Sequence, residues 1–140
     1  MDNQGVFVEW LDDGAIVIFR AETDDNEAVD VWADFITTIA AERPNDIAFI
    51  HDFSSISPTV TPYIRQKVKE INVEPNQGYV AVVLSRSVIS MMVRFFVNNE
   101  VVHLQPDVEH RIFFDRDQAI DWMRHKLEER VEEASISIVE

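Results

Sequence analysis

Strand-like and helix-like segments alternate along most of this chain, and that alternation limits its fold more than any other feature. Two runs rich in Val, Ile and Phe, Val6–Leu11 and Ala15–Ala21, come first. Asp12-Asp13-Gly14 separates them, and Asp-Gly between apolar runs is a strong hairpin signal. After the hairpin, strands and helices follow one another, which is typical of a parallel sheet built with right-handed crossovers. The sequence therefore predicts an α/β fold, in which a β-hairpin leads into a mostly parallel sheet of four or five strands with about four helices.

The helices are predicted from capping residues and apolar spacing. Asp24 and Glu27 have the spacing of a capping box before a helix over about 26–42. Thr61 is suited to cap a second helix, with Pro62 at its first position. Ser87 is suited to cap a third helix that extends to about Asn99, and Asp115 is suited to cap the last helix. The expected strands after the hairpin are Asp46–Phe53, Tyr79–Leu84 and Arg111–Phe114. We expect 101–110 to be irregular, and 134–139 to be an edge strand or to pair with another chain.

Length and composition limit the classes of function. The 140 residues suggest one domain over 1–130 with a C-terminal tail or edge strand over 131–140, and the absence of cysteine excludes thiolate chemistry. The net charge is −14, with 13 acidic and two basic residues over 1–58. Residues 59–100 instead hold three acidic and five basic residues. We expect no nucleic-acid partner, no integral membrane segment and a cytoplasmic location.

A hydroxyl-rich loop follows the central strand within 47–64. In open α/β sheets, functional loops lie beyond the carboxyl ends of the strands, so this junction is the candidate regulatory loop. Its candidate residues are Asp52, Ser54, Ser55, Thr59 and Thr61.

Three stretches resemble the STAS domain superfamily, and most closely its small SpoIIAA-like (STAS/Sec14-type) bacterial proteins. They are IAFIHDFSSIS, GYVAVVLSRSVISMMVRFF and HRIFFDRDQAIDWM, and the likeness covers most of residues 5–128. The resemblance implies a SpoIIAA-like fold and a regulatory role through a protein partner. In the anti-sigma-factor antagonists of that superfamily, a phosphorylated serine lies nine residues after the strand-end Asp. The matching position here is Thr61, although the family's Ser-Gly pair is replaced by Thr61-Pro62. Thr61 is therefore interpreted as a helix cap or as a phosphorylation switch.

His51-Asp52, at the end of the central strand, is a candidate base or metal ligand. Adjacent strand residues point to opposite faces, so the alternative is that the two side chains do not meet. The other histidines show no metal-ligand spacing, and we expect neither a metal nor another cofactor.

The middle of the chain carries cations suited to an anionic ligand or an acidic partner surface. The candidate contacts are Arg65, Lys69 and Arg86. The alternative is a solvated helix face.

The helix after Ser87 is apolar around almost its whole circumference, so it needs cover on more than one side. The candidate dimer or apolar-ligand surface is Met91, Met92, Phe95 and Phe96. Three covers are considered: the chain's own 101–104, a second subunit, or a lipid-like ligand.

The sequence contains no nucleophile–base pair and no phosphate-binding glycine loop. We expect a non-enzymatic interaction domain, dimeric, that binds a protein partner. The alternative is a sensor for a small apolar or anionic ligand held between the second and third helices. An enzyme using His51 or Asp52 is the third hypothesis.

Overall fold

The computed structural model describes residues 5–43, 47–56, 60–71 and 78–139. The described part of the chain forms one five-stranded sheet in the order β1-β2-β3-β4-β5, antiparallel between β1 and β2 and parallel elsewhere. The strands are β1 (Val6–Leu11), β2 (Ile16–Ala21), β3 (Ile47–Asp52), β4 (Gly78–Val83) and β5 (Val108–Phe113). The helices are α1 (Asn26–Glu42), α2 (Pro62–Glu70), α3 (Val88–Phe96), the π-helix η1 (Val97–Val101), α4 (Val102–Leu104) and α5 (Arg116–Val139). The predicted α/β class, the hairpin and the mostly parallel sheet are confirmed.

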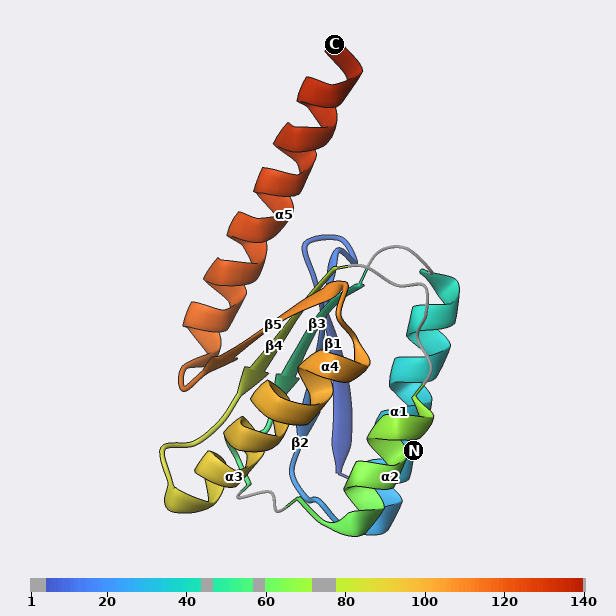
Figure 1. Cartoon of the computed structure of the whole chain (residues 1–140), viewed down its shortest axis with the longest axis vertical. Coiled ribbons are helices and arrows are strands. Elements are labelled where there is room, and N and C mark those ends of the chain that lie inside the picture. Colours follow the sequence, from blue (N-terminus) through green and yellow to red (C-terminus); the bar gives the residue numbers. More distant parts are fainter. Residues whose placement is uncertain (1–4, 44–46, 57–59, 72–77, 140) are drawn as a thin grey trace.

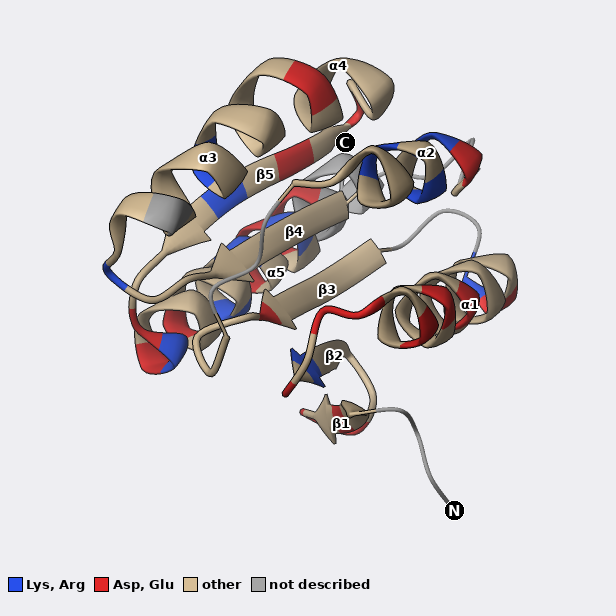
Figure 2. Cartoon of the chain, turned by 90° about the horizontal axis from the view of Figure 1, so that it is seen from below, with Lys and Arg blue, Asp and Glu red and all other residues tan. Residues whose placement is uncertain are grey.

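The helices divide unequally between the two faces of the sheet (Figures 1 and 2). Strands in sequential order, joined by crossovers of one hand, place every crossover helix on the same face. Accordingly, α1, α2 and α3 cover one face, where Phe19, Phe49 and Val82 lie in the core. The helix α5 covers the other face through Trp122 and Met123.

The hairpin turn has the backbone that its sequence predicts. Asp12 and Asp13 have φ of 54° and 57°, and Gly14 has φ of 88°. These left-handed conformations suit Asp and Gly, and the twist of such turns matches that of the strands. Gly14 N–H donates to the carbonyl of Leu11 at 3.1 Å.

The caps are placed as predicted in three of the four helices, including α5, where Asp115 Oδ1 accepts from Gln118 N–H at 3.4 Å. Thr61 Oγ1 accepts from Ile64 N–H at 3.1 Å, and Ser87 Oγ accepts from Ser90 N–H at 3.2 Å. At α1 the prediction is wrong by one residue, because Asp25 rather than Asp24 accepts from Ala28 N–H, at 2.9 Å.

The third helical segment is longer than predicted. It continues from α3 through η1 and α4 to Leu104, so much of the expected irregular segment is helical, and β5 begins at Val108 rather than Arg111. A π-helix bonds i to i+5, and this wider turn keeps Val97 and Val101, four residues apart, on the sheet side. The segment ends at Gln105 (φ −133°, ψ 69°), because a following proline, Pro106, disfavours helical backbone.

The tail is also helical, which corrects the expected edge strand at 134–139: α5 continues to Val139. No Gly or Pro interrupts 116–139, and several good helix formers lie between Glu128 and Ala134. Figure 1 shows the end of α5 rising beyond the sheet, and Val131 there is exposed.

Candidate functional site

Asp52 lies buried at the end of β3 and organises the loop that follows. Its Oδ1 accepts from Ser54 N–H at 3.0 Å and from Ser54 Oγ–H at 2.6 Å. Its Oδ2 lies 4.0 Å from Arg116 Nη1 at the start of α5. This is the arrangement of an Asx turn, so Asp52 shapes the strand exit.

The hydroxyl groups of the predicted regulatory loop differ in their exposure. Ser54 and Ser55 are exposed, Thr61 is half-buried, and Thr59 lies outside the described residues. The oxygen of Thr61 caps α2 through Ile64 N–H. The cap interpretation of Thr61 is thus seen directly, and phosphorylation stays a prediction.

His51 and Asp52 do not form a catalytic pair. Strand alternation directs Asp52 toward Arg116 on the α5 side and His51 toward Trp32 on the α1 side. Ser54 is hydrogen-bonded to Asp52, on the opposite face of the strand from His51, so the imidazole of His51 is not next to the Ser54 hydroxyl group. In the part of the chain that the structure describes, no group of three metal-ligating side chains gathers.

His51 is surrounded by four aromatic rings, those of Phe19, Trp32, Phe49 and Phe53. Trp32 Nε1–H donates to His51 Nδ1 at 3.0 Å. The imidazole is stacked between Phe19, with ring centroids 5.3 Å apart, and Phe53, at 6.0 Å. Burial, with a smaller contribution from the nearby His110, lowers the pKa of His51 to about 3. His51 is therefore neutral at physiological pH.

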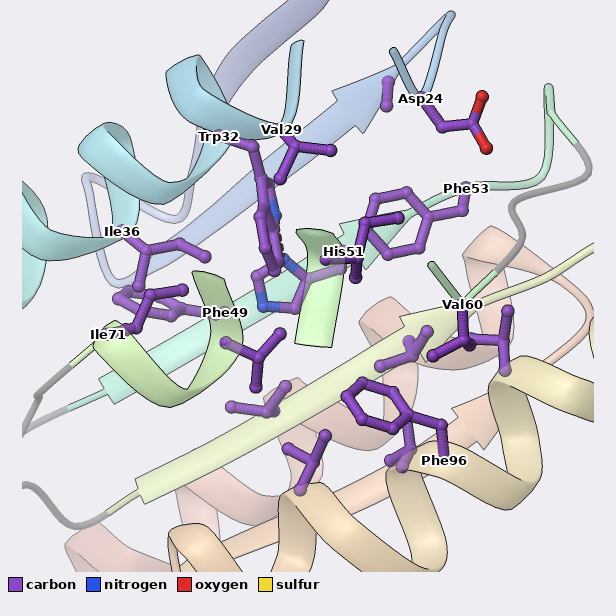
Figure 3. A pocket seen from close by; sticks show the side chains of 18 of the residues that line it. Asp24, Val29, Trp32, Ile36, Phe49, His51, Phe53, Val60, Ile71 and Phe96 are labelled. Carbon is purple, nitrogen blue, oxygen red and sulfur yellow. Dashed lines mark hydrogen bonds between the residues drawn. The ribbon is translucent and has the colours of Figure 1, made fainter. Parts of the chain in front are cut away.

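An apolar cavity of about 150 Å³ lies beside His51, between the sheet and the helices α1, α2 and α3; we call it the His51 cavity. Figure 3 shows Phe49, Val60, Ile71 and Phe96 around it, with the second ring nitrogen of His51 on the side of the open space. Asp24 stands at its edge, with its carboxylate directed away from His51. The other lining side chains are mainly aliphatic, from the core of this face.

The three predicted cationic contacts, Arg65, Lys69 and Arg86, have different neighbours in the structure. Arg65 Nη2 lies 3.1 Å from Glu100 Oε2, and its guanidinium lies 5.8 Å from the ring centroid of Phe96. Arg86 stacks on Phe114 at 4.7 Å, and Lys69 is exposed on α2. Two of the three predicted contacts, Arg65 and Lys69, thus lie on α2, and Arg86 lies between β4 and α3.

The helix α3 has one buried side and one exposed apolar side. Val88, Met91, Met92 and Phe95, here called the α3 face, are 57–81% exposed. Phe96 is buried instead and lines the His51 cavity, which corrects its place in the predicted dimer surface. Of the three covers considered, 101–104 is excluded, because that segment continues the helix and leaves the α3 face exposed. Val60 and Arg65 border a hollow beside the α3 face.

The Trp32–His51 contact was missed by sequence reasoning, although its signals are present. Trp32 lies on the apolar stripe of α1, and His51 alternates with Phe49 and Phe53 along β3 and its exit. Trp32 and His51 each place a ring with a polar nitrogen in an otherwise apolar row, one on α1 and one on β3. Because these two rows face each other, the pattern predicts that the two rings are in contact. The spacing cannot show that packing leaves a cavity next to them.

No family model, curated protein or solved structure matches the chain. The likeness to the STAS superfamily stays a prediction. Among the described helices, none combines the length and apolar character needed to cross a bilayer.

Proposed function

We propose that this chain is a non-enzymatic interaction domain that self-associates through the α3 face. One observation carries the proposal: four large apolar side chains lie together on one helix and are more than half exposed. Contiguous exposed apolar surface in a folded protein marks an interaction site more often than scattered single residues do.

The α3 face has the spacing that helix packing requires. Val88, Met91, Met92 and Phe95 recur at i, i+3, i+4 and i+7, which forms a continuous ridge along one side of a helix. Ser87 caps the first turn, so the ridge is presented on ordered backbone. The two methionines adapt their shape to an opposing surface.

Charge favours a second copy of the chain as the occupant. Each copy carries −14, but 59–100, which contains α3, is slightly cationic. Figure 2 shows tan along most of α3 and red on α1. Contact through α3 keeps the acidic parts of two copies apart, whereas contact through the acidic faces brings like charges together. A two-fold contact also makes the ridge its own complement.

The loop after β3 is the proposed recognition surface for a further protein partner. It lies at the carboxyl end of a parallel strand, with Ser54 and Ser55 exposed and its shape fixed by Asp52. The resemblance to SpoIIAA-like proteins supports a regulatory role of this kind in the cytoplasm.

Sedimentation velocity tests self-association directly. The unmodified chain is expected to shift from monomer toward dimer between about 1 and 100 μM. Phe95→Glu places a charge in the contact and is expected to keep the chain monomeric throughout that range. Val131→Glu is the matched control because Val131 on α5 and Phe95 have the same 67% exposure. It is expected to leave the dimer intact.

Two outcomes contradict the proposal. One is an unmodified chain that stays monomeric at the highest concentration, which would assign the α3 face to another occupant. The other is dimerisation lost in Val131→Glu but retained in Phe95→Glu, which would move the contact to the end of α5.

A further inference from the structure

The His51 cavity has one polar feature that the packing of the core does not explain. His51 is 7% exposed, and its Nδ1 accepts the indole N–H of Trp32. A neutral imidazole that accepts at one nitrogen carries its proton on the other, so Nε2 is a donor. Figure 3 shows that nitrogen turned from Trp32 toward the cavity. No described residue is hydrogen-bonded to it.

The second histidine at the cavity differs in this respect. His110 has Nδ1 at 3.1 Å from the carbonyl oxygen of Val108 and Nε2 at 3.2 Å from Gln105 Oε1. Both of its nitrogens therefore lie within hydrogen-bond distance of a polar atom of the protein. His51 Nε2 is left as a donor with no hydrogen-bond partner among the described residues, and a donor that loses water without gaining another partner is costly.

A water molecule is a poor partner for this donor. Buried waters typically make about three hydrogen bonds. Most of the lining side chains, such as Phe49, Val82 and Val97, provide none. Of the polar ones, His110 and Gln105 lie against each other, and the Asp24 carboxylate is directed away from His51.

We propose that the His51 cavity binds a small, neutral, mostly apolar molecule whose single acceptor oxygen takes the hydrogen bond of His51 Nε2–H. The volume of about 150 Å³ fits a molecule of roughly benzene size or slightly larger. A carboxylate is disfavoured, because no Lys or Arg is among the described residues that line the cavity and an unpaired buried charge is costly. This site is separate from the α3 face and does not depend on self-association.

Acetophenone and ethylbenzene form the probe pair, because they have similar shapes and differ in one carbonyl oxygen. Transfer from water alone favours ethylbenzene, since the ketone must lose its hydration. We expect the unmodified chain to bind acetophenone at least as tightly as ethylbenzene, measured by calorimetric titration and by the rise in Tm that binding to the folded state causes. Absence of binding by both probes overturns the site. A preference for ethylbenzene of more than about tenfold overturns the hydrogen bond.

His51→Phe removes the donor and keeps an aromatic ring in the stack. The ratio of acetophenone to ethylbenzene affinity is expected to fall by about tenfold in this variant. His125→Phe, at an exposed position on α5, is the control and is expected to leave the ratio unchanged. An unchanged ratio in His51→Phe contradicts the inference.

A measurement on the unmodified chain covers the case in which His51→Phe does not fold. The ¹⁵N resonance of His51 Nε2 reports its hydrogen bond directly. It is expected to shift with acetophenone and to shift much less with ethylbenzene. Equal shifts with both probes overturn the anchoring role of His51.

Discussion

At the scale of the residue, burial decides the chemistry of His51. The side chain is enclosed by Trp32, Phe19 and Phe53 and is kept neutral, with its pKa lowered to about 3. The same imidazole in solvent titrates near neutrality. His51 is therefore suited to donate one fixed hydrogen bond, and not to shuttle protons at physiological pH.

The lowered pKa makes stability depend on pH. The unfolded chain protonates His51 below its ordinary pKa of about 6.5, whereas the folded chain does not until about pH 3. The contribution of His51 to the free energy of unfolding is therefore fully present above pH 6.5 and is lost as the pH falls below that value. Between about pH 7.5 and pH 5.5 the loss from His51 is about 1.4 kcal/mol, and His110, whose pKa burial also lowers, acts in the same direction.

Denaturant unfolding of His51→Phe at those two pH values measures this contribution. On acidification, the free energy of unfolding of the variant is expected to fall by about 1.4 kcal/mol less than that of the unmodified chain. The exposed His125→Phe is expected to retain the original dependence. Equal pH dependence in His51→Phe and the unmodified chain would mean that His51 titrates in the folded state as it does in solvent.

Thr61 has a smaller and local energetic role. Thr61→Ala removes the acceptor for Ile64 N–H and is expected to lower the free energy of unfolding by about 1 kcal/mol. Thr61→Ser keeps the cap and is expected to be close to neutral. Thermal or urea unfolding of the two variants decides the matter, and equal losses in both would show that the hydroxyl group is not the source of stability.

At the scale of the element, α5 is divided between a buried half and an exposed end. Met123 has no exposed surface, and Trp122 packs beside it against Tyr79 and Phe113. Within the described chain, α5 is the helix that covers this face of the sheet. Farther along the same helix, Val131 is 67% exposed.

Two substitutions to alanine in α5 test this division. Met123→Ala is expected to cost about 2–5 kcal/mol of unfolding free energy, because it opens a cavity in the core. Val131→Ala is expected to change stability by less than about 0.5 kcal/mol. A large loss at Val131 would show that the end of α5 is covered in solution.

The elements that sequence predicts well are those whose local signals agree. The hairpin has apolar runs on both sides of Asp12-Asp13-Gly14, and α2 has Thr61 followed by Pro62, so both are predicted correctly. The errors occur where a local signal competes with packing. Val97 and Val101 pack against the core, and the third helix continues through them. Alternation at 134–139 favours a strand, whereas the helix α5 continues there.

The candidate site was predicted less completely than the fold. Strand alternation correctly separates His51 from Asp52, and the apolar character of α3 identifies an exposed face. Phe96 was assigned to that face because sequence does not fix how the helix is rotated about its axis. The His51 cavity arises from three helices meeting one sheet face, and no local pattern encodes such a gap.

At the scale of the whole molecule, the exposed apolar ridge lies apart from most of the negative charge. A chain of net charge −14 exposes its apolar ridge within the segment where cations exceed anions. Repulsion between two such chains acts over distances comparable to the Debye length, about 10 Å at 0.1 M salt. Salt therefore reduces the repulsion and leaves the apolar contact in place.

The salt dependence of self-association follows from this arrangement. Raising ionic strength from about 0.05 M to 0.5 M is expected to tighten the dimer several-fold. Sedimentation equilibrium at the two salt concentrations measures the change in Kd. A dimer that weakens with salt would be held by pairing of opposite charges and not by the α3 face.

The central claim, that two copies meet through α3, is tested most directly by cross-linking, which the absence of native cysteine makes unambiguous. Asn98→Cys places the thiol at an exposed position in η1, directly after α3. Val131→Cys places the thiol on α5. A short bismaleimide at protein concentrations near the dimer Kd is predicted to join two Asn98→Cys chains efficiently and Val131→Cys chains only at the collisional level. Efficient cross-linking through Val131→Cys, with none through Asn98→Cys, would contradict the account.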